Sequence, residues 1–93
     1  NKMDIIKELY EVIVDRKNNP VENSYTNYLM DKGVEKIAKK VGEEAVETAI
    51  AAAKKDKAEV IGEIADLEYH LLVLMVEMGI SLEELEAELK SRR

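Results

Sequence analysis

Residues 34–78 read VEKIAKKVGEEAVETAIAAAKKDKAEVIGEIADLEYHLLVLMVEM, two amphipathic segments on either side of a short polar KKD sequence. In both segments apolar residues recur every three or four positions, which is the pattern of a helix with one buried face. Asp56 can cap a new helix at its start, and Gly79 can end that helix in a left-handed conformation. The stretch therefore predicts two long helices, over residues 34–55 and 57–78, that form an antiparallel hairpin.

Shorter helices are expected on both sides of this hairpin. Residues 3–17 have helical periodicity up to an Asn-Asn-Pro sequence, and proline disfavours a helical conformation in the residue before it. Ser24 can cap a helix over residues 25–32, and Ser81 can cap a last helix that ends near Arg92. We predict no strands, because no segment shows the period of two that marks a half-buried strand.

Length and composition favour one all-α domain over residues 1–93. The chain has one proline and four glycines and is too short for two ordinary domains. Cysteine is absent, which excludes disulfides, thiolate zinc sites and cysteine nucleophiles. A formal charge of −6 argues against nucleic-acid binding, and no apolar run approaches the roughly 18 residues of a membrane span. We expect a cytoplasmic protein with neither nucleic acid nor membrane as a partner.

One part of the second long helix is apolar nearly all round. Between Tyr69 and Val76 the only strongly polar side chain is His70. A helix that is apolar on all sides is buried on all sides, and the flanking helices can cover only part of it. We therefore expect a homodimer in which two hairpins form a four-helix-bundle core. The alternative is a compact monomer in which the short helices are sufficient cover.

Four carboxylates are placed symmetrically about the turn of the hairpin. Glu47 lies eight residues before Lys55, and Glu63 lies eight residues after it. Glu44 and Asp66 lie eleven residues before and after the same position. The spacing within each pair puts both acids on one helix face, and the antiparallel arrangement brings the two faces level. Converging acids repel one another unless a cation binds, so the pattern indicates a Mg²⁺ or Mn²⁺ site. A solvated acidic face is the alternative.

Around these acids the sequence resembles the all-α nucleoside triphosphate pyrophosphohydrolases of the MazG-like group. That resemblance rests on Glu43-Glu44-x-x-Glu47 followed by Glu63-x-x-Asp66. Several more specific motifs resemble those of the phosphoribosyl-ATP pyrophosphohydrolase family of histidine biosynthesis. They are Ser24-Tyr25-Thr26, Gly33, Lys40-Val41-Gly42-Glu43-Glu44-Ala45, and Ala65-Asp66-Leu67 through Tyr69-His70. Together they span almost the whole chain.

The resemblance implies Mg²⁺-dependent hydrolysis of the α–β phosphoanhydride of phosphoribosyl-ATP to phosphoribosyl-AMP and pyrophosphate. The positions that match the family's metal ligands are Glu44, Glu47, Glu63 and Asp66. Glu43 and Glu47 are the candidates for accepting a proton from the attacking water. Candidate substrate contacts are Lys36 and Lys40 for the phosphates, with Arg16, Ser24, Tyr25 and Thr26 closing the substrate side. His70 matches a motif position to which no role is assigned.

Two other functions remain open. A house-cleaning (d)NTP pyrophosphatase would share the metal site and differ in its nucleoside pocket. A non-catalytic helical dimer would carry the acids as a solvated face and would show no effect of Mg²⁺ on melting. The chain lacks the cyclohydrolase domain that accompanies this activity in some organisms, so we expect a separate enzyme, and a start at Asn1 is expected to reflect trimming.

Overall fold

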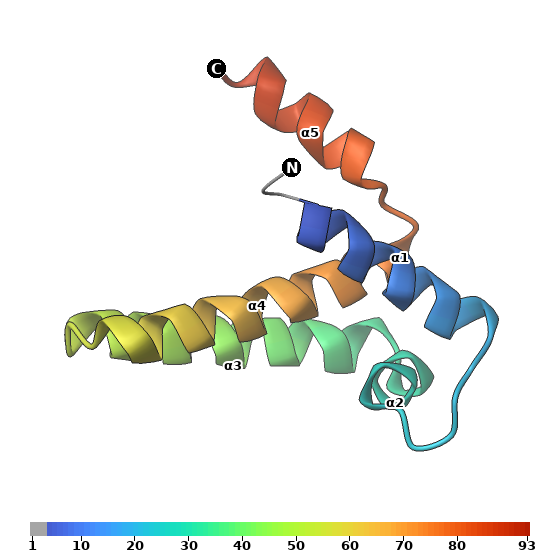
Figure 1. Cartoon of the computed structure of the whole chain (residues 1–93), viewed down its shortest axis with the longest axis horizontal. Helices are drawn as coiled ribbons and strands as arrows, with labels where there is room; N and C mark the ends of the chain where they lie inside the picture. The colour runs from blue at the N-terminus through green and yellow to red at the C-terminus, as the bar shows by residue number, and fades with distance from the viewer. Residues whose placement is uncertain (1–3) are drawn as a thin grey trace.

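The computed structural model describes residues 4–93, which form five helices and no strand. The helices are α1 (Asp4–Asn18), α2 (Tyr25–Lys32), α3 (Val34–Ala53), α4 (Lys57–Met78) and α5 (Leu82–Ser91). α3 and α4 make an antiparallel hairpin whose closed end projects as an arm beyond the other helices (Figure 1). The predicted all-α hairpin with short flanking helices is confirmed. The predicted homodimer stays a prediction.

Side-chain caps start three of the helices at the residues that the sequence indicates. Ser24 caps α2, Asp56 caps α4 and Ser81 caps α5. The last is a complete capping box, because Ser81 accepts from the Glu84 backbone N–H while the Glu84 carboxylate accepts from the Ser81 N–H. Gly79 ends α4 with φ 71° and ψ 29°, a left-handed conformation that glycine adopts without strain.

The observed helix ends differ slightly from the predicted ones. The predicted start of the first helix, Met3, lies outside the described residues, and α1 ends at Asn18, one residue later than predicted. α3 ends at Ala53 and not at Lys55, because Lys55 has a φ of 58°, which cannot continue a right-handed helix. The last helix ends at Ser91, next to its predicted end.

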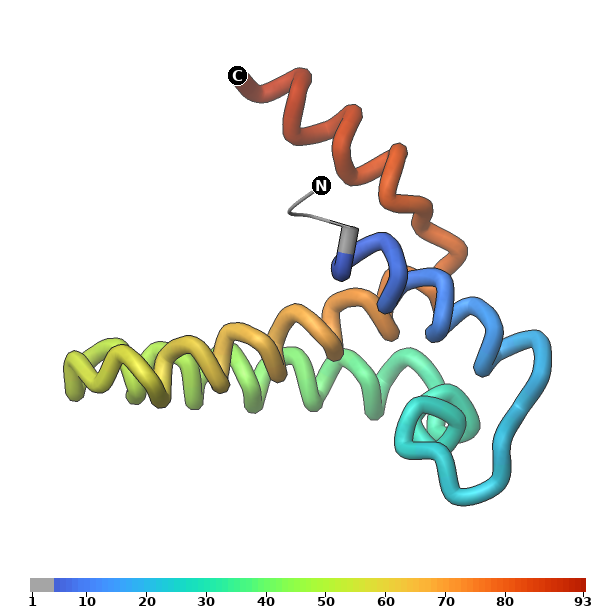
Figure 2. The backbone as a smooth tube through the Cα atoms, viewed as in Figure 1, coloured from blue at the N-terminus to red at the C-terminus, as the bar shows by residue number. Residues whose placement is uncertain are grey.

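The core lies where α1 and α2 meet the open end of the hairpin. The apolar part of α4, residues 69–76, is buried or half-buried here within the single chain, so the flanking helices cover more of it than the sequence analysis expects. The cluster consists of Ile13, Leu29, Ile37, Leu72, Val73, Met75 and Val76. Burying each of these larger side chains contributes about 1.5–3 kcal/mol, so the cluster anchors α1 and α2 against the hairpin. The loop between α1 and α2 wraps around this end, as the tube in Figure 2 shows.

Two parts of the molecule lie outside this core. On the projecting arm, Val46, Ile50, Ile61 and Ile64 are 49–60% exposed. α5 leaves the end of α4; its first residue, Leu82, packs partly against the core, and every later residue of the helix is exposed. Both the arm and α5 therefore expose apolar side chains that the single chain does not cover.

None of the described helices combines the length and the apolar character that crossing a membrane requires.

Candidate functional site

Three carboxylates converge partway along the hairpin. One oxygen each from Glu44 on α3 and from Glu63 and Asp66 on α4 lie within 4.8 Å of one another. Glu44 is only 8% exposed, because it shares the inner face of α3 with Ile37 and Ala51. Glu63 is half-buried and Asp66 is exposed, so the cluster opens to solvent at Asp66.

The electrostatics of this cluster are unfavourable without a cation. The negative charge of Glu44 raises the pKa of Glu47, with desolvation as the next cause. Burial raises the pKa of Glu63, and the charges of Glu47, Asp66 and Glu44 add to that effect. All four predicted acids therefore lie close enough to repel one another. Glu47 lies outside the tight group of three.

The residues present fit a hard divalent cation. Oε1 of Glu63 is buried and has no hydrogen-bond partner among residues 4–93. A buried carboxylate oxygen without a partner is costly, and coordination would satisfy it. The donor set is entirely oxygen, which Mg²⁺ and Mn²⁺ prefer over softer ligands. Glu44, Glu63 and Asp66 could therefore hold such an ion.

Lys40 borders the cluster from one turn earlier on α3. Its Nζ lies 3.4 Å from Oε1 of Glu43 and 3.6 Å from Oε2 of Glu44. The hydrogen bond to Glu43 raises the pKa of Lys40, so the ammonium form is favoured. A shallow hollow of about 780 Å³ lies alongside and is lined by Lys40, Gly42, Glu43, Val46 and Glu47. An anionic group in this hollow would meet Lys40.

Tyr25, the first residue of α2, reaches towards the same region. Its hydroxyl lies 2.8 Å from Nε2 of His70, and Nδ1 of His70 lies 2.7 Å from the backbone oxygen of Asp66. Because a carbonyl oxygen only accepts hydrogen bonds, Nδ1 carries the hydrogen, and in the neutral ring Nε2 accepts from Tyr25. Burial raises the pKa of Tyr25, and the nearby charge of Lys40 opposes that shift.

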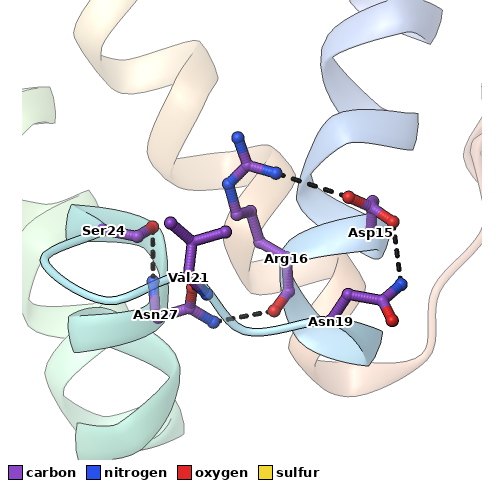
Figure 3. A network of polar contacts seen from close by, with 6 residues as sticks. All are labelled: Asp15, Arg16, Asn19, Val21, Ser24 and Asn27. Atoms are coloured by element: carbon purple, nitrogen blue, oxygen red, sulfur yellow. Dashed lines mark hydrogen bonds and ion pairs between the residues drawn. The ribbon is translucent and has the colours of Figure 1, made fainter.

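Arg16 and Ser24 lie in a polar network that ties the end of α1 to the start of α2 (Figure 3). The backbone oxygen of Arg16 accepts from Nδ2 of Asn27 at 2.7 Å, and Ser24 accepts from the Asn27 N–H. The Arg16 guanidinium lies 3.4 Å from the neighbouring Asp15 carboxylate. The network therefore positions α2, and with it Tyr25, relative to α1.

The other two predicted substrate contacts differ in burial. Thr26 is buried, and its hydroxyl is hydrogen-bonded to the Tyr69 hydroxyl. Lys36 is half-buried on α3, one turn before Lys40, and makes no ion pair within residues 4–93. The roles of Thr26 and Lys36 in substrate binding stay predictions.

The hydrogen-bonded connection from Tyr25 through His70 to Asp66 was not found from the sequence. One signal for half of it exists, since His70 follows Asp66 by four residues and shares its helix face. The other contact, between Tyr25 on α2 and His70 on α4, joins residues 45 positions apart, and no local spacing in the sequence predicts such a contact.

Comparison with known proteins places this chain in a family. The sequence model described as phosphoribosyl-ATP pyrophosphohydrolase matches residues 6–93. The chain belongs to the phosphoribosyl-ATP pyrophosphohydrolase family. The matched range includes every carboxylate of the cluster as well as Tyr25 and His70. The resemblance drawn from the sequence motifs is confirmed, and membership in this family of hydrolases makes the chain an enzyme.

Curated relatives from three organisms are similar over most of the chain. A phosphoribosyl-ATP pyrophosphatase of Clostridium novyi is 53% identical over 93 residues, which cover 100% of this chain and 84% of the relative. One of Streptococcus thermophilus is 55% identical over 89 residues, 96% of this chain and 86% of the relative. A histidine biosynthesis bifunctional protein of Thermoanaerobacter pseudethanolicus is 62% identical over 81 residues, 87% of this chain but 38% of that protein.

Proposed function

We propose that this enzyme hydrolyses the α–β phosphoanhydride of phosphoribosyl-ATP at the acidic cluster, releasing phosphoribosyl-AMP and pyrophosphate in histidine biosynthesis. One observation carries the proposal: three carboxylates converge around a buried, unpartnered oxygen of Glu63 in a chain of this family. In this proposal Glu44, Glu63 and Asp66 hold Mg²⁺, and Mn²⁺ can replace it. When bound, the cation supplies charge neutralisation for the triphosphate and lowers the pKa of a coordinated water.

Glu47 is the favoured acceptor for the proton of the attacking water. It adjoins the group of three without belonging to it, so its carboxylate is free to accept a proton beside the proposed cation. Glu43 is the less favoured candidate, because its carboxylate is paired with Lys40 at 3.4 Å. Glu43 instead orients Lys40.

Two lysine side chains and the start of α2 complete the proposed substrate site. Lys40 contacts the phosphates, since its ammonium lies at the edge of the cluster, and Lys36 adds a second positive charge one turn away. The nucleoside lies towards Tyr25. Arg16, Ser24 and Thr26 act mainly by holding α2 in place, because each has a partner there or in the interior.

We also propose that two chains pair through the projecting arms of the hairpin. Val46 and Ile50 on α3 and Ile61 and Ile64 on α4 expose about half or more of their surfaces. Packing two arms into a four-helix bundle would remove this apolar surface from water. Each dimer would then carry two equivalent sites. A cytoplasmic location goes with a phosphorylated nucleotide substrate.

The test is turnover of phosphoribosyl-ATP with and without Mg²⁺, followed by chromatography of pyrophosphate and phosphoribosyl-AMP. We expect metal-dependent release of both products. Glu63→Gln should lower kcat by at least about 100-fold, because even residues that only support metal ligands commonly cost 10- to 100-fold. The control is Glu59→Gln, which removes an acid one turn earlier whose carboxylate pairs with Lys54 at 2.7 Å.

Competing substrates separate the proposal from its rival. If dNTPs are cleaved and phosphoribosyl-ATP is not, the house-cleaning (d)NTP pyrophosphatase replaces it. If Glu63→Gln and Glu59→Gln lose activity equally, the acidic cluster is not the catalytic centre.

A further inference from the structure

His70 is a buried polar residue to which the proposed hydrolysis assigns no part. It is the only histidine of the chain and is 5% exposed. Both of its ring nitrogens are engaged, Nδ1 with the Asp66 carbonyl at 2.7 Å and Nε2 with the Tyr25 hydroxyl at 2.8 Å. Rotating the ring would leave buried polar groups unsatisfied. His70 therefore holds the Tyr25 hydroxyl in one place relative to α4.

Tyr25 is the exposed end of this connection. Tyr25 is 46% exposed, although three neighbouring rings restrict the orientation of its own ring. Tyr28 and Tyr69 stack against it with ring centroids at 6.2 Å and 6.3 Å, and the His70 ring meets it edge-on at 5.7 Å. Aromatic contacts of this kind are individually weak but orient the rings. The result is an ordered tyrosine with a free surface.

This ordered tyrosine is joined to the cluster through His70, which is hydrogen-bonded to the Tyr25 hydroxyl at 2.8 Å and to the backbone oxygen of Asp66 at 2.7 Å. The charges of Lys40 and Glu44 both act on the Tyr25 hydroxyl, which puts it within electrostatic reach of the cluster. A nucleotide whose phosphates occupy the cluster must extend its ribose and base along the neighbouring surface. An exposed aromatic ring with a fixed hydroxyl offers that part of the ligand both an apolar face and a hydrogen-bonding group.

We propose that His70 is a positioning residue that fixes Tyr25 where its ring and hydroxyl contact the nucleoside part of the substrate. The inference rests on the proposed function for the identity of that substrate. Tyr25 touches the ligand, and His70 acts only through Tyr25. Nucleotide affinity should therefore depend on the pair, whereas the chemical step at the cluster should depend on it little.

The test is a double-mutant cycle of Tyr25→Phe and His70→Leu. One readout is KM and kcat for phosphoribosyl-ATP. The other is the dissociation constant of α,β-methylene-ATP, a nucleotide without a hydrolysable α–β bond, measured by calorimetry. Each single change should raise KM and Kd about 3- to 10-fold, the effect of losing one hydrogen bond, with kcat lowered less than about 2-fold. The double variant should be no worse than the weaker-binding single variant, because both changes remove the same contact.

Tyr10→Phe is the matched control. Its hydroxyl donates to the Ile80 carbonyl at 2.7 Å, so the change removes the same atom from a similar bond outside the site. We expect a lower melting temperature and unchanged KM and Kd. His70→Gln, which keeps an acceptor for Tyr25, should recover most of the affinity lost in His70→Leu.

The outcomes distinguish the inference from the proposed function. If Tyr25→Phe leaves Kd unchanged, as Tyr10→Phe does, or if the single effects add in the double variant, the positioning role is overturned. Tyr25→Phe decides this even if His70→Leu fails to fold. If the wild-type protein does not hydrolyse phosphoribosyl-ATP and the Kd values shift as expected, the proposed function fails and the positioning of a bound nucleotide is supported.

Discussion

Glu44 and Glu63 show how single residues in this protein oppose folding. Glu44 lies on a helix face with Ile37 and Ala51, where a charge is costly to bury. Lys40 compensates in part from 3.6 Å, but Glu63 brings a second carboxylate with an unpartnered oxygen. Groups kept in such an arrangement typically mark functional sites, and here they mark the proposed cation site.

Removing two of the repelling acids should stabilise the metal-free protein near neutral pH. The pKa values of Glu47 and Glu63 are raised above the ordinary 4.5, so their folded forms hold protons more tightly than their unfolded forms. The two carboxyl groups therefore add to the stability of the folded protein when the pH is below their unfolded pKa. This added stability is lost as the pH rises through their folded pKa. In EDTA, Glu47→Gln/Glu63→Gln protein should melt at a higher temperature than wild type at about pH 7.5, with the gap closing towards about pH 4.5.

The melting temperatures are measured by circular dichroism across this pH range. The control is Glu8→Gln/Glu11→Gln, which also removes two carboxylates but takes them from exposed positions on α1, away from the cluster. The difference in melting temperature between this control and the wild type should not shrink as the pH falls. If the difference between the Glu47→Gln/Glu63→Gln variant and the wild type stays constant with pH, repulsion among the acids is not its cause. Added Mg²⁺ should raise the melting temperature of the wild type and not that of the cluster variant.

At the scale of elements, the junction between α4 and α5 depends on one backbone conformation. Gly79 has φ 71°, and a Cβ built there meets no described atom within 4 Å. Gly79→Ala should therefore cost only backbone strain, about 1 kcal/mol, which corresponds to a melting temperature roughly 4–8 °C lower for a domain of this size.

Gly79→Asn is the control for this change, because asparagine tolerates the left-handed region better than alanine. It should lower the melting temperature by clearly less, at the same protein concentration. Equal losses in the two variants would mean that something other than the left-handed conformation decides stability at the junction.

At the scale of the whole molecule, the uncovered arm argues that the single chain is incomplete. The buried cluster lies at the open end of the hairpin, whereas the closed end exposes apolar residues of both long helices. Small domains bury a limited fraction of their surface and gain stability from association. The proposed dimer would cover the exposed apolar residues of the arm and add the stability that a small domain gains from association.

A charge placed on the arm should separate the dimer. Ile61 is 60% exposed, and Ile61→Lys would bury an unpaired ammonium in the proposed interface. Sedimentation equilibrium should give twice the 10.5 kDa chain mass for wild type and the single mass for the variant. Val12→Lys, at an exposed apolar position on α1, should stay dimeric. A monomeric wild type would exclude the arm as an interface.

Local sequence patterns are sufficient to predict the helices, their caps and the approximate register of the hairpin. Helical periodicity and capping are local properties, so Ser24, Asp56, Ser81 and Gly79 could be read directly as helix ends. The convergence of the acids also followed from spacing, because an antiparallel hairpin converts equal distances from a turn into neighbouring positions.

Local patterns do not show which side chains meet and which remain uncovered; the packing of the helices sets both. This packing separates Glu47 from the group of three, joins Tyr25 of α2 to His70 of α4, and leaves the arm exposed. The last two features depend on how α1 and α2 pack against the hairpin, a contact between segments distant in the chain. Helix periodicity states which face is buried, but it carries no information about which partner covers that face.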